Sequence, residues 1–236
     1  MKDKNTIELN QRKPAWISGI FQAAPILLGY IPIGFAYGVL AQKAGLSVYN
    51  TLLMSLIVFA GSSQLIAVGL ISAGLAPLSI ILTTFIVNLR HMLMSAALTP
   101  YLGGWRKIGL ALFGFEITDE TFALHANRFP AEGVQKAEAF AINVTSHAAW
   151  ILGSLLGSLG SRLITDVEQY ALDYALPAMF IALLVMQIKN KPQIAVAVIS
   201  GILSVFLLLN GFSHWYVIMA TIVGASFGVV VEKWMM

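Results

Sequence analysis

Cysteine is absent from the chain of 236 residues, and only 11% of the residues are charged. Without cysteine the protein can form neither disulfide bonds nor thiolate metal sites, and we expect no bound metal or cofactor. A soluble domain has about 25% charged residues, so the scarcity of charge excludes an ordinary soluble fold. The net charge of only +3 provides no broad basic surface, and we expect no nucleic-acid partner.

The sequence is instead strongly apolar, with 58% hydrophobic residues and a mean hydropathy of +0.81. This composition predicts an all-α integral membrane protein, a compact bundle of seven to eight transmembrane helices in the lipid bilayer. The polar run FEITDETFALHANRF (115–129) overlaps one apolar segment, so we leave open whether 49–72 and 107–126 fully cross the membrane. Windows of about 20 residues give eight segments: 16–41, 49–72, 76–102, 107–126, 138–161, 171–188, 193–210 and 215–232.

The positions of lysine and arginine predict the orientation of these segments. We expect a cytoplasmic polar tail at 1–15, a single transmembrane transporter domain at 16–232 and a cytoplasmic C-terminal end at 233–236. A re-entrant segment at 49–72 or 107–126 would lower the number of spans to seven and place the two ends on opposite sides, and this alternative stays open. With eight spans, nine basic residues lie inside: Lys2, Lys4, Arg12, Lys13, Arg128, Lys136, Lys189, Lys191 and Lys233. Four lie outside: Lys43, Arg106, Lys107 and Arg162.

Several of the apolar segments are interrupted. Pro25 and Pro32 lie in the first segment, FAGSSQL (59–65) in the second and Pro177 in the sixth. They indicate either kinks stabilised by neighbouring helices or broken helices whose freed backbone groups and dipoles face a substrate. Their recurrence in both halves favours broken helices. The pairing of FAGSSQL with IVGASFG (222–228), and of Pro25 with Pro177, indicates a weak inverted repeat.

Small residues also recur at a spacing of four, a pattern that lets helix backbones approach closely in a membrane. We expect them to lie in helix–helix contacts. They are Gly34 and Gly38, Gly153 and Gly157, and Ala220, Gly224 and Gly228.

Two polar stripes follow helical spacing within apolar segments, and such stripes face protein or water rather than lipid. His91 and His147 are candidate proton carriers because imidazole titrates near neutral pH, and hydrogen-bonded packing histidines are the alternative. We expect His125 and His214, near segment ends, at the membrane interface. The first stripe comprises Thr84, Asn88, His91, Ser95 and Thr99, and the second comprises Asn143, His147, Trp150 and Ser154.

Arg90 needs a counter-charge from another segment, because no acid lies three or four residues away on its own helix. An unpaired arginine at mid-bilayer costs at least about 2.5–3.5 kcal/mol. The pair is either an internal ion pair that orients two helices or a site that binds a charged substrate or carries protons. The acids either share one helix face, or Thr118 or Asp119 caps a short helix over 120–128. The acids in the first four segments are Glu116, Asp119 and Glu120.

These features favour a secondary transporter for a small polar or zwitterionic solute. Ser62, Ser63 and Gln64 are predicted to hydrogen-bond the solute, as an unwound helix does in transporters, or to bridge two helices. One alternative is a channel, although a single copy lacks repeated rings of charge. Another is an intramembrane serine hydrolase with Ser62 or Ser63 as nucleophile and His91 or His147 as base. The run GSSQL lacks the closing glycine of G-x-S-x-G, so we expect no enzyme.

Four stretches resemble the AzlC-type family of branched-chain amino acid permeases. They are FQAAPILLGYIPIGFAYG (21–38), FAGSSQLIAVGLI (59–71), IVNLRHMLMSAALTPYL (86–102) and ITDETFAL (117–124). The N-L-R-H run, followed by T-D-E about thirty residues later, is the most specific part. Leu65 stands where the family commonly has an aromatic residue.

The resemblance implies a multi-pass exporter of valine, leucine and isoleucine in the bacterial cytoplasmic (inner) membrane. Such permeases pair with a small hydrophobic AzlD-type subunit. No ATP-binding motif occurs, so coupling is expected either to an ion gradient or to an energised partner protein.

The site predicted for the amino-acid substrate combines both lines of reasoning. Its carboxylate is expected near Arg90 or the amides of Ser62, Ser63 and Gln64, and its ammonium group near Asp119 or Glu120. Its aliphatic side chain is expected against Phe59, with Asn88 and His91 along the same route. The candidates for proton coupling are His91, Asp119, Glu120 and His147.

Overall fold

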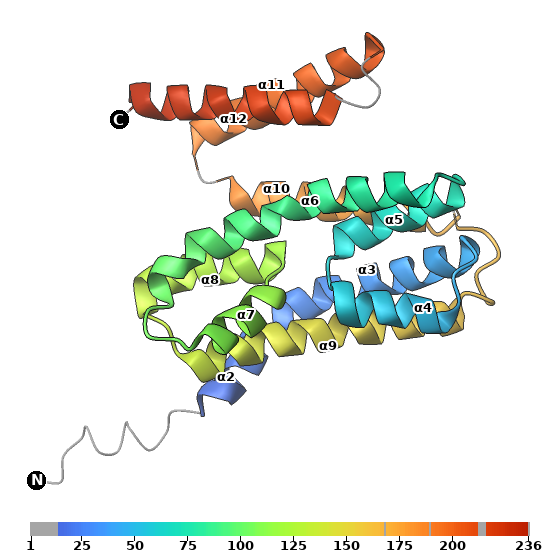
Figure 1. The fold of residues 1–236 in the computed structure, drawn as a ribbon, viewed down its shortest axis with the longest axis horizontal. Helices are drawn as coiled ribbons and strands as arrows, with labels where there is room; N and C mark the ends of the chain where they lie inside the picture. Colours follow the sequence, from blue (N-terminus) through green and yellow to red (C-terminus); the bar gives the residue numbers. More distant parts are fainter. Residues whose placement is uncertain (1–13, 168, 189, 212–215, 236) are drawn as a thin grey trace, which may run out of the picture. The chain divides into compact units, whose positions relative to one another are not determined.

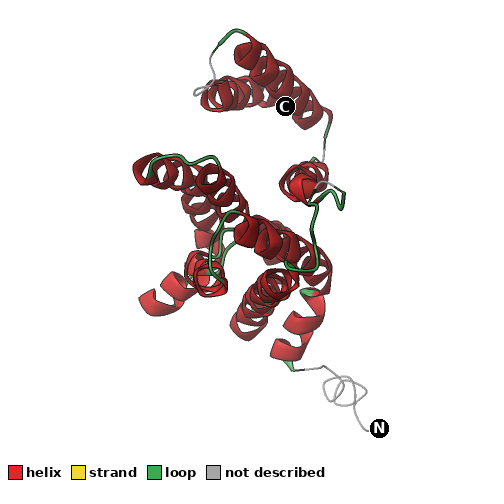
Figure 2. Ribbon diagram, turned by 90° about the vertical axis from the view of Figure 1, so that its right-hand side faces the viewer, coloured by secondary structure: helices red, strands yellow, loops and turns green. Residues whose placement is uncertain are grey.

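The computed structural model describes residues 14–167, 169–188, 190–211 and 216–235. The regular elements in these residues are helical (Figure 1), and Figure 2 shows helices and loops there without a strand. The predicted all-α class is therefore confirmed. The predictions for most of the N-terminal tail, for His214 and for the last residue lie outside the described residues.

The chain divides into two compact units, Met1–Phe180 and Ile181–Met236. The prediction that 16–232 form one transmembrane domain stays a prediction. Helix α10 (Ala175–Gln187) contains the boundary, and the second unit continues with α11 (Lys191–Leu209) and α12 (Tyr216–Met235). The first unit contains α2 (Ala15–Gln22), α3 (Ala24–Lys43), α4 (Val48–Leu53), the π-helix η1 (Met54–Val58), α5 (Gly61–Ser72), α6 (Pro77–Leu98), η2 (Thr99–Tyr101), α7 (Lys107–Phe115), α8 (Asp119–Glu132), α9 (Lys136–Gly160) and η3 (Leu172–Tyr174).

Four helical stretches of the described chain are long and apolar enough to cross a membrane. The count of seven to eight spans remains a prediction, because the segments at 49–72 and 107–126 are each divided into shorter helices. The four stretches are Ala24–Lys43, Pro77–Tyr101, Lys136–Gly160 and Lys191–Leu209.

Helices α3 and α9 pack side by side along their lengths (Figure 1), with glycines at the contact. A Cβ atom on Gly38 would lie 2.3 Å from the carbonyl oxygen of Ser154, and one on Gly157 would lie 2.0 Å from that of Phe35. No side chain fits into this space, so the predicted role of the small residues in close helix packing is confirmed. In the second unit Gly224 of α12 makes a similar close approach, to Ser200 of α11.

The prolines differ in their effects on the helices. Pro25 lies in the first turn of α3, directly after the break that separates α2 from α3 at Ala23. That position suits proline, since its missing N–H would have no intrahelical partner there. The break considered at Pro32 is absent, because α3 continues through this residue. Pro177 is the third residue of α10 and so lies in its first turn, directly after the 3-10 helix η3.

The core of the first unit consists of two apolar clusters. One is built around Tyr37, Phe59 and Trp150, and the other around Leu98 and Phe113. The opposite, apolar face of α6 is exposed, as expected of a lipid-facing surface, and comprises Leu78, Ile81, Leu82, Phe85, Ile86, Leu89, Met92 and Leu93. The polar stripe of α6 therefore faces the protein up to Ser95, whereas Thr99 is exposed.

Candidate functional site

The first helix break that forms the site lies between α4 and α5. The helix widens into the π-helix η1, which ends at Phe59 with φ 41° and ψ 51°. This left-handed conformation costs a residue other than glycine about 1–2 kcal/mol, and π-helical turns occur often at functional sites. Two contacts hold the break: the Phe59 ring stacks on His147 at 3.9 Å between centroids, and Gln64 Oε1 accepts hydrogen bonds from Ala60 N and Trp150 Nε1.

The second break lies between α7 and α8. Thr118 begins α8 with a capping box: its Oγ1 accepts a hydrogen bond from Thr121 N at 3.3 Å, and Thr121 Oγ1 accepts one from Thr118 N at 2.9 Å. The predicted alternative of a capped helix in a broken fourth segment is therefore confirmed, and the helix extends beyond 128 to Glu132. The other alternative, three acids on one helix face, is wrong because Glu116 lies in the break.

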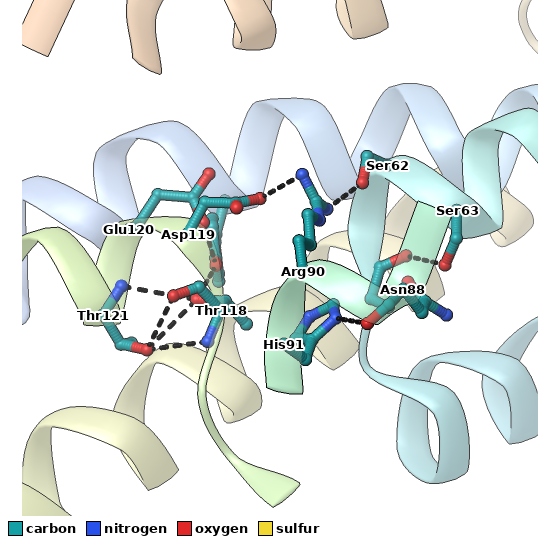
Figure 3. A network of polar contacts seen from close by, with 11 residues as sticks. Ser62, Ser63, Asn88, Arg90, His91, Thr118, Asp119, Glu120 and Thr121 are labelled. Atoms are coloured by element: carbon teal, nitrogen blue, oxygen red, sulfur yellow. Dashed lines mark hydrogen bonds and ion pairs between the residues drawn. The ribbon is translucent and has the colours of Figure 1, made fainter. Parts of the chain in front are cut away.

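Arg90 of α6 lies between the starting turns of α5 and α8 (Figure 3). Its Nη1 is 2.7 Å from Asp119 Oδ2, and its Nη2 donates a hydrogen bond to Ser62 Oγ. The counter-charge that Arg90 required is thus Asp119, the first residue of α8. The side chains are 25% and 14% exposed, so water screens this ion pair only weakly.

A small cavity surrounds the ion pair. Its volume is about 10 Å³, room for roughly one water molecule. In this conformation the cavity is too small for an amino acid. The residues that line it are Tyr30, Phe59, Ala60, Gly61, Ser62, Arg90, His91, Thr118, Asp119, Glu120 and Trp150.

Tyr30 of α3 is a residue of the site that sequence reasoning missed. Its Oη lies 2.5 Å from Glu120 Oε2 and 2.6 Å from Thr118 Oγ1, and only 4% of the residue is exposed. The signal was present, because a buried tyrosine hydroxyl in a membrane span needs a hydrogen-bond partner. Tyr30 connects α3 to the N-terminus of α8 and orients Glu120.

The predicted site residues divide into those at the cavity and those that hold the breaks. Ser62, Arg90, His91, Asp119 and Glu120 line the cavity. Ser63 Oγ donates to the carbonyl oxygen of Ala60, Gln64 Nε2 donates to Ser55 Oγ, and Asn88 borders a neighbouring cavity. Contact between these residues and a solute stays a prediction. In the described part of the chain neither Ser62 nor Ser63 hydrogen-bonds a histidine, so the geometry gives no support to a serine hydrolase.

His147 of α9 connects the two helix breaks. Its Nδ1 is 3.1 Å from both carboxylate oxygens of Glu116, between α7 and α8, and its Nε2 is 3.0 Å from the carbonyl oxygen of Ser55 in η1. A shift of either break would change the surroundings of this imidazole. Both ring nitrogens therefore face oxygen atoms, Nδ1 a carboxylate and Nε2 a backbone carbonyl.

His125 is not interfacial, contrary to the prediction. It is 0% exposed, its Nε2 lies 2.7 Å from Asn143 Oδ1, and its ring stacks on Phe129. The break before Thr118 starts a new helix that packs against α9, and His125 lies on its inner face. The predicted inward stripe of α9 is confirmed, since Asn143, His147, Trp150 and Ser154 are all buried.

These features define a helical membrane protein whose buried charges meet where two broken helices begin. The family model described as AzlC protein matches residues 25–164. An uncharacterized membrane protein of Archaeoglobus fulgidus is 36% identical over 81% of this chain and 84% of its own. The chain therefore belongs to the AzlC family.

Two named relatives are more distant. The inner membrane protein YgaZ of Escherichia coli is 29% identical over 77% of this chain and 76% of its own. The branched-chain amino acid transport protein AzlC of Bacillus subtilis is 27% identical over 89% of this chain and 84% of its own. No solved structure matches the chain. The family and these relatives support a role in membrane transport.

Proposed function

We propose that the protein is a secondary transporter that exports branched-chain amino acids across the bacterial cytoplasmic membrane. The observation that carries this proposal is the Arg90–Asp119 ion pair at the starting turns of two broken helices. Broken helices that meet around a charged group are the usual construction of a substrate site in secondary transporters. The name of the Bacillus subtilis relative supports branched-chain amino acids as the substrate class.

The ion pair suits a zwitterion because a zwitterion can replace both of its charges. When the pair separates, the solute carboxylate binds Arg90 and the solute ammonium binds Asp119. Each charge then keeps one opposite partner, which avoids the large cost of a buried charge left alone. The ion pair itself is neutral, so the exchange of partners leaves neither Arg90 nor Asp119 without an opposite charge.

Backbone groups at the start of α5 add to the binding of the carboxylate. The first N–H groups of a helix have no intrahelical partner, and they attract anions together with the helix dipole. Ser62, in the first turn of α5, contacts Arg90. A carboxylate bound to Arg90 would therefore lie close to these amides, while Glu120 stays hydrogen-bonded to Tyr30.

Coupling to a proton gradient is assigned to His147 and Glu116 in this proposal. The pair contacts both helix breaks, so protonation there would affect the elements that hold the solute site. We expect His147→Gln to keep solute exchange between two equal pools and to lose at least about tenfold of gradient-driven transport. Counterflow and uptake driven by a pH gradient measure the two activities. Equal loss of both would remove His147 from the coupling step.

The proposal also includes a small hydrophobic AzlD-type subunit and a cytoplasmic N-terminus. Counterflow of radiolabelled leucine in proteoliposomes tests the function directly, with the chain reconstituted alone and with the small hydrophobic protein encoded beside it. Saturable counterflow in either preparation supports the proposal, and counterflow only with the second protein makes that subunit obligatory. If neither preparation exchanges leucine, valine or isoleucine, the proposed substrate class is wrong.

A further inference from the structure

A second, larger cavity borders the charged one. Its volume is about 230 Å³, against about 10 Å³ for the charged cavity. Phe59, Ala60 and His91 line both cavities, so the two adjoin at these residues. The second cavity is lined by Val58, Phe59, Ala60, Asn88, His91, Gly114 and Phe115.

Five of the seven residues that line this second cavity are apolar or glycine. Asn88 and His91 are its polar residues, and His91 Nδ1 already lies 3.1 Å from the carbonyl oxygen of Asn88. The other residues come from the first break and from the end of α7. The cavity therefore lies between the two helix breaks that form the charged site.

We propose that this cavity receives the aliphatic side chain of the solute and limits its size. This inference rests on the proposed function, which assigns the two charged groups of the same solute to Arg90 and Asp119. A branched-chain amino acid has its charges at one end and a compact apolar group at the other. The two adjoining cavities match that division, one charged and one apolar.

The wall between the two cavities is where the chain leaves helical conformation. Phe59 is left-handed and Ala60 is also non-helical, with φ −136° and ψ 80°. Hinges commonly absorb large changes in φ and ψ at such positions between elements. Rotation there would join the charged cavity of about 10 Å³ to the apolar cavity of about 230 Å³ without unwinding a helix.

Gly114 is the position at which the size limit is most directly testable. A Cβ atom added to Gly114 would meet only Ser95 Oγ, at 3.8 Å, an ordinary contact, and its φ is not in the left-handed range. A larger side chain should therefore be accommodated by the fold and occupy cavity space. Gly69 of α5 offers a matched control, since it is exposed and a Cβ there would meet nothing within 4 Å.

The experiment compares Gly114→Val, Gly69→Val and the parent protein in counterflow of radiolabelled alanine, valine, leucine and phenylalanine. We expect Gly114→Val to raise the KM for leucine about tenfold relative to alanine, since one methylene group in an apolar pocket changes binding by roughly 10–200-fold. Gly69→Val should keep the parent's order of preference. Phe115→Ala should change selectivity in the opposite direction and favour phenylalanine.

A thiol at the same position tests occupancy directly. Because the chain has no cysteine, Gly114→Cys carries the only thiol, and we expect leucine to slow its alkylation more than alanine does. An unchanged leucine-to-alanine ratio in Gly114→Val, together with equal alkylation with and without leucine, would show that the side chain of the solute does not enter this cavity. That result overturns this inference alone. Absence of amino-acid counterflow in the parent would overturn the proposed function as well.

Discussion

At the scale of single residues, the Arg90–Asp119 ion pair has two possible roles. It either binds the solute or only holds α6 and α8 together. In either case Arg90→Ala leaves Asp119 without its partner in a weakly hydrated site. Breaking a buried pair in this way costs about 3–5 kcal/mol, and we expect the lower end because Arg90 is 25% exposed. Removing both charges should restore much of this stability.

The two roles predict different transport in the double variant. We expect Arg90→Ala combined with Asp119→Ala to recover thermal stability in detergent while leucine counterflow stays at least about a hundredfold below the parent. Thermal unfolding and counterflow on the same preparations check this. Arg162→Ala, at an exposed loop position, is the matched control and should leave both unchanged. Transport restored together with stability would show that the pair only holds α6 and α8 together.

The cost of leaving a charge unpaired explains which part of the site could be predicted from the sequence. Arg90 required a carboxylate because no acid on its own helix could reach it, and only three acids occur in the first four segments. Choosing Asp119 among them depends on where α8 begins. Tyr30 and His125 were missed or misplaced because their surroundings come from helices distant in sequence, and no local pattern encodes those contacts.

At the scale of elements, the two breaks have different local causes. The second depends on the capping box of Thr118 and Thr121. We expect Thr118→Ala to destabilise the protein by about 1 kcal/mol, the usual cost of a lost N-cap, and to reduce transport by displacing Asp119. Thr118→Ser keeps the accepting oxygen and should retain most of the stability and transport. Thermal unfolding with counterflow measures both variants, and equal effects of alanine and serine would remove the cap from the explanation.

Apolar segments identified in hydropathy windows predicted most of the helices but not the residues at which they begin and end. Apolar windows of about 20 residues detect a segment such as 49–72 as one unit, because Phe59 and Ala60 are themselves apolar. The break there follows from the π-helix and from the hydrogen bonds of Gln64, which no window average contains. Proline was a weaker guide, since Pro32 remains inside α3 whereas Pro25 and Pro177 lie in the first turns of helices.

At the scale of the whole molecule, the position of the two ends depends on how the broken segments cross the membrane. Nine basic residues inside against four outside favour cytoplasmic N- and C-termini with eight spans. We therefore expect a fluorescent protein that matures only in the cytoplasm to be bright at either end. A bright N-terminal fusion with a dark C-terminal fusion would instead indicate a re-entrant segment, at 49–72 or 107–126.

The glycine contact between α3 and α9 limits how such a molecule could move. The backbones are in direct contact there, because a Cβ atom added to Gly157 or Gly38 would lie only 2.0 or 2.3 Å from a carbonyl oxygen of the other helix. Sliding one helix past the other would drive larger neighbouring side chains into that contact. We therefore expect α3 and α9 to move as one rigid pair. Access of a solute to either side of the membrane would then change through movement of the short helices that pack against this pair.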